Sequence, residues 1–198
     1  MSRIAQHKSK LNYLLQNGIH VLWQKGYHGT SVNDIVGAAD VPKGSFYSYF
    51  DSKEDFVVKA LQYYHEQQVA PALQILEDAR ISPLQRIINF YEYRINNAQT
   101  CAVQERGCMV SNLATEMAGQ SEIIRETVVA LDNKLKTKAS EVLSKAKEKG
   151  EIKNNHDPIE IIGFAEDALK GALTSAKASK NNQPLQTCLK FIKHLLVV

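Results

Sequence analysis

Residues 30–53, which read TSVNDIVGAADVPKGSFYSYFDSK, decide the fold of this chain. Apolar residues recur at helical spacing after Ser31, a favourable N-cap, so the first part predicts a short helix. The pattern breaks at residues 40–42, because the aspartate tolerates a left-handed turn and the proline disfavours helix at the residue before it. A second helix then begins, with Phe46 and Phe50 on the face that packs back on the first. The stretch therefore predicts two short helices joined by a tight turn.

The outward face of the second helix is small, basic and rich in hydroxyl groups. Glycine and serine near its start let a partner approach the backbone, and the N-terminal N–H groups with a lysine favour an anion such as phosphate. These features are typical of a recognition helix that enters the DNA major groove N-terminus first. Spacing alone would also fit a solvated surface hairpin. The outward positions are Lys43, Gly44, Ser45, Tyr47, Ser48 and Tyr49.

Two runs around this stretch resemble the DNA-binding domain of the TetR family of bacterial repressors. They are Gly26-Tyr27-x-x-Thr30-Ser31-Val32-x-x-Ile35 and Val41-Pro42-Lys43-Gly44-Ser45-Phe46-Tyr47-x-Tyr49-Phe50-x-Ser52-Lys53-Glu54. Asp40 departs from the family, where glycine is usual, and Tyr49 stands where histidine is common. The resemblance implies phosphate contacts by Ser31, Tyr47, Tyr49 and Lys53. It implies positions nearest to the base edges for Lys43, Gly44, Ser45 and Ser48.

The composition is that of a globular protein with little strand. Of 198 residues, 44% are hydrophobic and 23% charged, and glycine and proline are sparse. We expect an all-α chain, with a three-helix helix-turn-helix DNA-binding domain over residues 1–52. A helical effector-binding and dimerisation domain is expected over residues 53–198. Residues 1–53 contain six Lys or Arg against three acidic residues, whereas the remainder contains equal numbers, so the positive excess lies in the part expected to bind DNA.

Helical spacing and capping residues place the other elements. Helices are expected over residues 8–25, 53–69, from 83 into the nineties, 106–118, 122–149, 158–179 and 184–196. Gly26 and Gly150 are expected to end two of them, and Pro71 to kink or end another. The small residues of the helix over 158–179 allow close helix approach. The last two helices are strongly apolar. Burial within one subunit would explain this, but the family resemblance implies a four-helix interface in a homodimer.

A second motif, Arg106-Gly107-Cys108-Met109-x-x-Asn112-Leu113-x-x-Glu116, is similar to a segment of TetR-family repressors that sense reactive electrophiles. If Gly107 opens a helix, Cys108 lies at its positive end beside Arg106, and both features favour thiolate. Alternatively, Cys108 is a small apolar filler beside a non-covalently bound ligand. Cys101 is expected to be filler and Cys188 to be core. The expected effector residues are Cys108, Met109, Asn112, Tyr91 and Arg94, with Tyr93, Met117 and Phe164 as further lining.

These patterns together predict a cytoplasmic DNA-binding regulator. It would be a homodimeric repressor that binds a near-palindromic operator and is released by a small-molecule or electrophilic effector. No transmembrane-length run, signal sequence, cofactor motif or metal-ligand spacing is seen, and the odd cysteine count favours a reducing compartment. Two other classes are weighed: an enzyme with Cys108 as nucleophile, although no histidine has suitable spacing, and a helical adaptor or non-specific DNA-coating protein.

Overall fold

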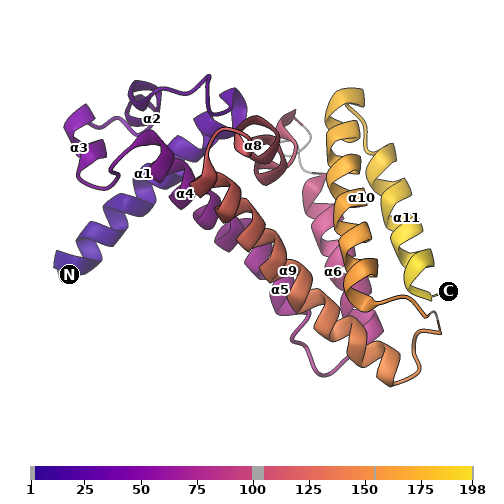
Figure 1. The fold of residues 1–198 in the computed structure, drawn as a ribbon. Coiled ribbons are helices and arrows are strands. Elements are labelled where there is room, and N and C mark those ends of the chain that lie inside the picture. Colours follow the sequence, from indigo (N-terminus) through magenta and orange to yellow (C-terminus); the bar gives the residue numbers. More distant parts are fainter. Residues whose placement is uncertain (1–2, 100–104, 154, 198) are drawn as a thin grey trace. The chain divides into compact units, whose positions relative to one another are not determined.

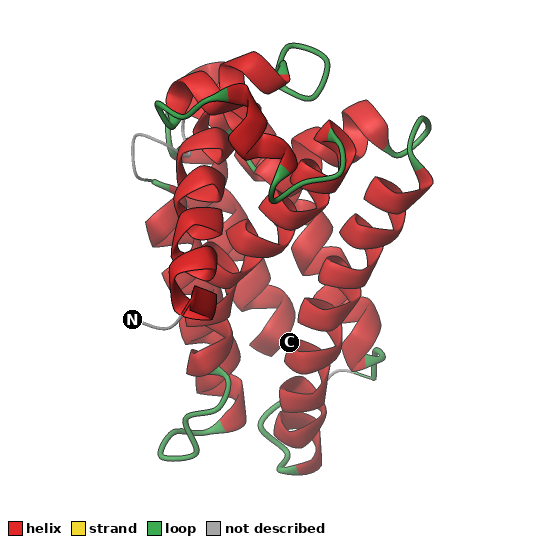
Figure 2. Cartoon of the chain, turned by 90° about the vertical axis from the view of Figure 1, so that its left-hand side faces the viewer, coloured by secondary structure: helices red, strands yellow, loops and turns green. Residues whose placement is uncertain are grey.

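The computed structural model describes residues 3–99, 105–153 and 155–197, and within these ranges the regular elements are all helices (Figures 1 and 2). The all-α class is therefore confirmed. The elements are α1 (Arg3–Lys25), α2 (Val32–Ala38), α3 (Lys43–Tyr47), α4 (Lys53–Tyr64), the π-helical turn η1 (His65–Val69), α5 (Ala70–Ile75), α6 (Pro83–Ala98), α8 (Met109–Met117), α9 (Glu122–Glu148), α10 (Pro158–Ser179) and α11 (Gln183–Val197).

The chain divides into two compact units. The N-terminal unit comprises Met1–His65 together with Met109–Val129, and the C-terminal unit comprises Glu66–Cys108 together with Ala130–Val198. The chain therefore passes from one unit into the other between Cys108 and Met109. These units are defined by which residues pack together. The boundary between functional domains that was predicted after residue 52 stays a prediction.

The core of the N-terminal unit is built on aromatic rings from α3, from the segment that follows it and from α4. Phe46, Phe50 and Phe56 are buried, and the centroid of the Phe50 ring lies 4.9 Å from that of Phe46 and 5.1 Å from that of Phe56. Gly18 lets α1 pack closely here, because a Cβ at this position would lie 2.8 Å from side-chain atoms of both Ile35 and Phe56. The burial predicted for Phe46 and Phe50 is thus confirmed.

The predicted starts and stops are largely confirmed. Side chains of Ser31, Ser52, Ser82 and Asp157 accept hydrogen bonds from the first turns of α2, α4, α6 and α10. Ser121 does the same for α9, accepting from the N–H of Ile124 at 3.3 Å. The backbone turns left-handed at Gly26 (φ 73°), which ends α1, and at Gly150 (φ 69°), which follows α9. Asp40 adopts φ 50°, the turn conformation that the sequence predicts for it.

Three predictions of local structure need correction. The first helix begins at Arg3, not near residue 8. The helix after Ser52 is regular only to Tyr64; a π-helical turn follows, and Pro71 lies at the start of α5, where its missing N–H costs little. Gly107 does not open a helix over 106–118. It adopts φ 71°, a left-handed conformation that interrupts the helical path, so α8 begins at Met109.

The C-terminal unit is a helical bundle with one apolar core. In Figure 1, α10 and α11 lie side by side, and α11 also packs on α6, which in turn contacts α5. The ends of the bundle are joined by polar contacts such as that from the N–H of Leu84 to the carboxylate of Glu151 at 2.8 Å. The core side chains of α6 include Ile87, Phe90, Tyr91 and Ile95, and those of α10 and α11 include Ile162, Ala165, Leu169, Leu185 and Ile192.

Candidate functional site

The helix-turn-helix has a rigid connection between its two helices. After α2 the chain turns at Asp40, and the N–H of Val41 donates to the carbonyl of Val36 at 3.1 Å. Pro42 is extended (φ −61°, ψ 147°) and precedes α3 as its N-cap residue. The ammonium of Lys59 on α4 donates to the carbonyl of Tyr49 at 3.0 Å, which fixes the segment after α3. The backbone that presents α3 is therefore tied at both ends.

The outer face of α3 carries polar side chains that the fold itself does not use for packing. Lys43, Gly44 and Ser48 are exposed, and Tyr47 is 57% exposed. A Cβ on Gly44 would meet no atom within 4 Å, so nothing inside the chain requires glycine there. A glycine in a helix costs roughly 0.5–1 kcal/mol relative to alanine. Ser45 and Tyr49 are half-buried, and the ring of Tyr49 lies 4.7 Å from that of His7 on α1.

Two of the residues expected to contact phosphate are also engaged within the N-terminal unit. Ser31 is exposed and forms a capping box with Asp34, which the ammonium of Lys25 contacts at 2.6 Å. Lys53 is half-buried; its ammonium donates to the carbonyls of Tyr27 (3.1 Å) and Thr30 (3.0 Å) and lies 4.0 Å from the centroid of the Tyr27 ring. These bonds account for two of the three N–H donors of Lys53.

A carboxylate on α8 joins that helix to the loop between α1 and α2. The backbone N–H groups of Tyr27 and His28 donate to Glu116 at 2.7 and 2.8 Å. Gly26 makes room for this contact, since a Cβ there would lie 2.6 Å from the Glu116 carboxylate. A second link joins Ser121 to Glu54 of α4. Glu116 was noted only as part of a motif, and its partner His28 lies 88 residues away along the chain, so no local pattern could have predicted this contact.

The C-terminal unit contains a cluster of polar side chains in its core. Arg94 of α6 forms an ion pair with Glu166 of α10, and Glu166 is only 2% exposed. The Arg94 guanidinium lies over two aromatic rings of α6, 5.0 Å from the centroid of Phe90 and 6.0 Å from that of Tyr91. The Tyr91 side chain is fully buried, and its hydroxyl lies close enough to the Glu166 carboxylate to interact with it. We call Tyr91, Arg94 and Glu166 the buried polar cluster.

The residues of the buried polar cluster shift one another's pKa values. Burial raises the pKa of Tyr91 well above its ordinary value, and the nearby Glu166 carboxylate raises it further. Burial disfavours the charge on Arg94, but attraction to Glu166 outweighs this effect and raises the pKa of Arg94. Tyr91 therefore remains a neutral hydroxyl and Arg94 a cation at any physiological pH. Tyr91 and Arg94 were predicted from the sequence but Glu166 was not, because a glutamate on an otherwise apolar helix has no distinguishing spacing.

Both described cysteines lie near this cluster. Cys188 of α11 is buried in the core, as predicted; burial raises the pKa of its thiol, and Glu166 adds to that shift. Cys108 is a free, half-buried thiol, and it is close enough to Arg94 to contribute to the raised pKa of that guanidinium. It directly precedes α8 instead of lying in a helix begun by Gly107. Cys101 lies outside the described residues.

The remaining predicted effector residues are divided between the two compact units. Met109, Asn112 and Met117 belong to the N-terminal unit, where both methionines are buried and Asn112 is half-buried. Tyr93 packs beside the core of the C-terminal unit. Phe164 was expected to line an effector pocket; its side chain is 66% exposed on α10, outside the core of a single chain, and its role stays a prediction.

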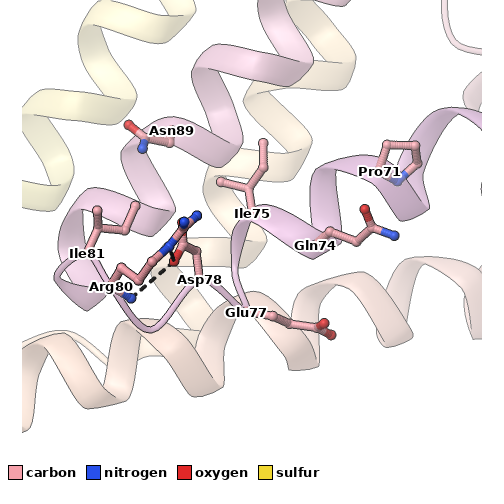
Figure 3. Close-up of a pocket in the computed structure, with 8 residues that line it drawn as sticks. All are labelled: Pro71, Gln74, Ile75, Glu77, Asp78, Arg80, Ile81 and Asn89. Atoms are coloured by element: carbon pink, nitrogen blue, oxygen red, sulfur yellow. Dashed lines mark hydrogen bonds and ion pairs between the residues drawn. The ribbon is translucent and has the colours of Figure 1, made fainter.

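An open surface depression of about 490 Å³ lies elsewhere on the C-terminal unit (Figure 3). It is formed by α5, α6 and the loop between them, and it contains the exposed ion pair of Arg80 with Asp78 at 2.7 Å. None of the predicted effector residues lines it. In the part of the chain that the structure describes, no group of three potential ligands could hold a metal, and no helix has the length and apolar character to cross a membrane.

Comparison with known proteins identifies the family. The family model described as bacterial regulatory proteins, tetR family, matches residues 14–60, and that described as tetracyclin repressor-like, C-terminal domain, matches residues 83–192. The chain belongs to the TetR family. The first match spans the whole helix-turn-helix and the second contains the buried polar cluster, so the chain is a transcriptional regulator with an N-terminal helix-turn-helix and a helical C-terminal domain.

Relatives of similar length support this assignment. The chain is 28% identical over 185 residues to the HTH-type transcriptional repressor DhaR of Mycobacterium sp. (strain GP1), which covers 93% of this chain and 91% of that protein. It is 28% identical over 203 residues to the HTH-type transcriptional repressor NemR of Escherichia coli (strain K12), covering 99% and 98%.

Two solved structures share the fold. The reduced form of E. coli NemR has a TM-score of 0.84 at 25% identity and covers 94% of this chain and 96% of that chain. A cysteine mutant of the TetR family regulator CifR, solved with 26 bp double-strand operator DNA, has a TM-score of 0.77 at 23% identity, covering 92% and 93%. The second likeness concerns the fold alone.

Proposed function

We propose that this TetR-family regulator is a repressor that binds a near-palindromic operator through the outer face of α3. The observation that carries the proposal is an exposed, polar α3 surface that is held rigidly and contains a glycine the fold does not need. Lys43, Gly44, Ser45 and Ser48 are nearest to base edges, and Ser31, Tyr47, Tyr49 and Lys53 contact phosphates. Base contacts give sequence preference, whereas phosphate contacts give affinity and position. The proposed place of action is the cytoplasm, where the homologous bacterial transcription regulators typically act.

We further propose that the operator-binding form is a homodimer joined through α10 and α11. Phe164 of α10 and Phe191 of α11 are 66% and 62% exposed, which is unusual for phenylalanine on two adjacent helices. Gly163 and Gly171 also face open space within the chain, so these small residues serve no close approach inside one subunit. A second copy that covers both helices would bury the aromatic side chains and use the small residues. Two reading helices would then match two operator half-sites.

The effector is proposed to act at the C-terminal unit, with Cys108 as the sensing thiol. The chain enters the N-terminal unit directly after Cys108, and α8 is fastened to the loop before α2 through Glu116. Alkylation or oxidation of Cys108 would displace the start of α8, and the Glu116 contacts would carry that displacement to the helix-turn-helix. The alternative is a non-covalent ligand, with Cys108 purely structural. We do not propose a cysteine-dependent enzyme, because the chain's relatives are regulators.

Fluorescence anisotropy with DNA tests these proposals. A duplex would be selected from a random pool by the purified protein and compared with a scrambled duplex, before and after addition of 1,4-benzoquinone. Selective binding that the quinone abolishes in the wild type but not in Cys108→Ser supports the sensing repressor. Selective binding that the quinone leaves unchanged keeps the operator proposal and rejects the thiol switch. Equal affinity for selected and scrambled DNA contradicts the operator proposal and favours a non-specific DNA-coating protein.

A further inference from the structure

One peptide group in the loop between α1 and α2 is hydrogen-bonded at both of its ends. Its N–H, which belongs to His28, donates to the Glu116 carboxylate on α8 at 2.8 Å. Its carbonyl, which belongs to Tyr27, accepts from the Lys53 ammonium on α4 at 3.1 Å. A carboxylate and an ammonium that lie far apart in the sequence are therefore joined through a single peptide group.

The two charges act on this peptide group in the same direction. The carboxylate attracts the N–H end of the peptide dipole and the ammonium attracts the carbonyl end, so each hydrogen bond polarises the group and strengthens the other. Glu116 also accepts from the N–H of Tyr27 at 2.7 Å, and Lys53 also donates to the carbonyl of Thr30 at 3.0 Å. Each charged group thus binds the loop twice.

The surroundings leave the Glu116 carboxylate little freedom to move. Gly26 follows α1 with φ 73°, and a Cβ at that position would lie 2.6 Å from a carboxylate oxygen of Glu116. Beyond α8, Ser121 is hydrogen-bonded to Glu54, the residue that follows Lys53 on α4. The segment that carries Glu116 is therefore fastened both to the loop and to the first turn of α4, where Lys53 lies.

We propose that Glu116 is a positioning residue for operator binding, which fixes the Lys53 ammonium through the peptide group between Tyr27 and His28. The inference rests on the proposed phosphate contact of Lys53. Two N–H donors of Lys53 bind loop carbonyls, so one donor remains for a phosphate oxygen, and the loop sets the place of the ammonium. Glu116 does not contact DNA in this role: it holds the loop, and the loop holds the lysine.

This role predicts a particular kind of loss in DNA binding. A phosphate contact adds affinity for any sequence and releases counterions from the DNA. Its loss therefore weakens the binding of selected and scrambled duplexes alike, and it reduces the slope of log Kd against log salt concentration. A disturbance of α3 would instead reduce the preference for the selected duplex. A variant that acts through Lys53 should lose salt dependence and keep sequence preference.

The test measures Kd by fluorescence anisotropy for full-length Glu116→Gln at several salt concentrations, with the selected and the scrambled duplex. Glutamine has the same length, but it offers one acceptor oxygen where the carboxylate binds two backbone N–H groups. Kd should rise about tenfold for both duplexes, the order expected for one hydrogen bond to a charged oxygen, and the salt slope should fall by about 0.9 per half-site. Glu122→Gln on α9 is the matched control. It removes the same charge from an exposed ion pair with Arg125 and should leave the slope unchanged.

Two further variants separate the effect of position from that of charge. Glu116→Asp keeps the charge but is one methylene shorter, so it should reproduce the loss seen in Glu116→Gln. Lys53→Met removes the ammonium and should lower the slope by the same amount. In the double variant Glu116→Gln with Lys53→Met, the slope should equal that of Lys53→Met alone, because both residues serve one contact. Glu116 is half-buried, so its variants should fold, which urea unfolding checks.

Several results would overturn the proposal. A wild-type slope in either Glu116 variant, together with a reduced slope in Lys53→Met, would keep the phosphate contact of Lys53 and reject the positioning role of Glu116. A slope that falls further in the double variant, or a loss of preference for the selected duplex in Glu116→Gln, would show that Glu116 acts elsewhere in the N-terminal unit. A wild-type slope in Lys53→Met would reject the proposed phosphate contact itself, and the inference with it.

Discussion

The two compact units place the polar groups of their candidate sites in opposite environments. In the N-terminal unit, the polar face of α3 is exposed, and the fold beneath it rests on apolar rings such as Phe46 and Phe50. In the C-terminal unit, Arg94, Glu166 and Tyr91 lie inside the core. The exposed side chains of α3 can therefore change with little effect on folding, whereas Arg94, Glu166 and Tyr91 are part of the core that folding requires. In the N-terminal unit, mutations of the exposed α3 face should affect function without affecting folding. In the C-terminal unit, mutations of the buried polar residues should affect both.

The largest expected effect on folding is in the C-terminal unit. Arg94→Met leaves the Glu166 carboxylate buried without its partner, which should lower the free energy of unfolding by about 3–5 kcal/mol. Urea unfolding followed by circular dichroism measures this. Lys193→Met is the matched control, because it breaks an ion pair with Glu92 that is about 40% exposed, and it should cost no more than about 1 kcal/mol. Equal costs would show that burial does not distinguish the two pairs.

The second largest effect on folding is expected in the N-terminal unit, where α1 packs closely at Gly18. Gly18→Ala places a Cβ 2.8 Å from atoms of Ile35 and Phe56, and relief of that overlap should cost about 1–3 kcal/mol. The loss should appear as a lower urea midpoint for the N-terminal unit. Gly37→Ala on α2 is the control, since its Cβ meets no atom within 4 Å and alanine is the better helix former. A Gly18→Ala protein as stable as the wild type would contradict the close packing of α1.

A smaller, pH-dependent effect is expected where α9 meets α10. Burial alone would raise the pKa of Asp132, but hydrogen bonds from Lys136 and Lys170 lower it below the ordinary value. The folded pKa is therefore below the unfolded one. The resulting stability is complete above about pH 4 and is lost as the pH falls through the folded pKa. Asp132→Asn should reduce the loss of stability between pH 6 and pH 3 by about 1 kcal/mol or less, measured by urea unfolding.

Local sequence patterns were sufficient to predict most helices and turns, but they were not sufficient to predict the contacts that form the candidate sites. Caps such as Ser31 and Asp157 and the turn at Asp40 depend on a few adjacent residues, so their chemistry is readable from the sequence. Gly107 was misread, because a glycine can either begin a helix or adopt a left-handed φ, and only the path of the chain decides. The π-helical turn before Pro71 likewise has no local sequence pattern that would predict it.

The residues of the candidate sites also differ in whether the sequence could predict them. The outward positions of α3 follow from helical periodicity, and the exposure of Lys43, Tyr47 and Ser48 agrees with that spacing. The partners of Arg94 and of the loop before α2 lie 72 and 88 residues away along the chain, so spacing could not identify Glu166 or the contact of Glu116. The 66% exposure of Phe164 could not be predicted either, because apolar character alone does not distinguish a buried helix face from an exposed one.

The smallest expected effect on folding belongs to the face of α3, and it tests the central claim most directly. Gly44→Ala adds a methyl group that meets nothing in the chain, so the free energy of unfolding should stay the same or rise slightly. If this face lies against DNA, the same methyl group obstructs the approach. The measurement is the anisotropy-derived Kd for the selected duplex, with Gly119→Ala, an exposed position outside the helix-turn-helix, as control. We predict at least about tenfold weaker binding for Gly44→Ala and wild-type binding for Gly119→Ala. Wild-type affinity in Gly44→Ala would contradict the assignment of this face to DNA.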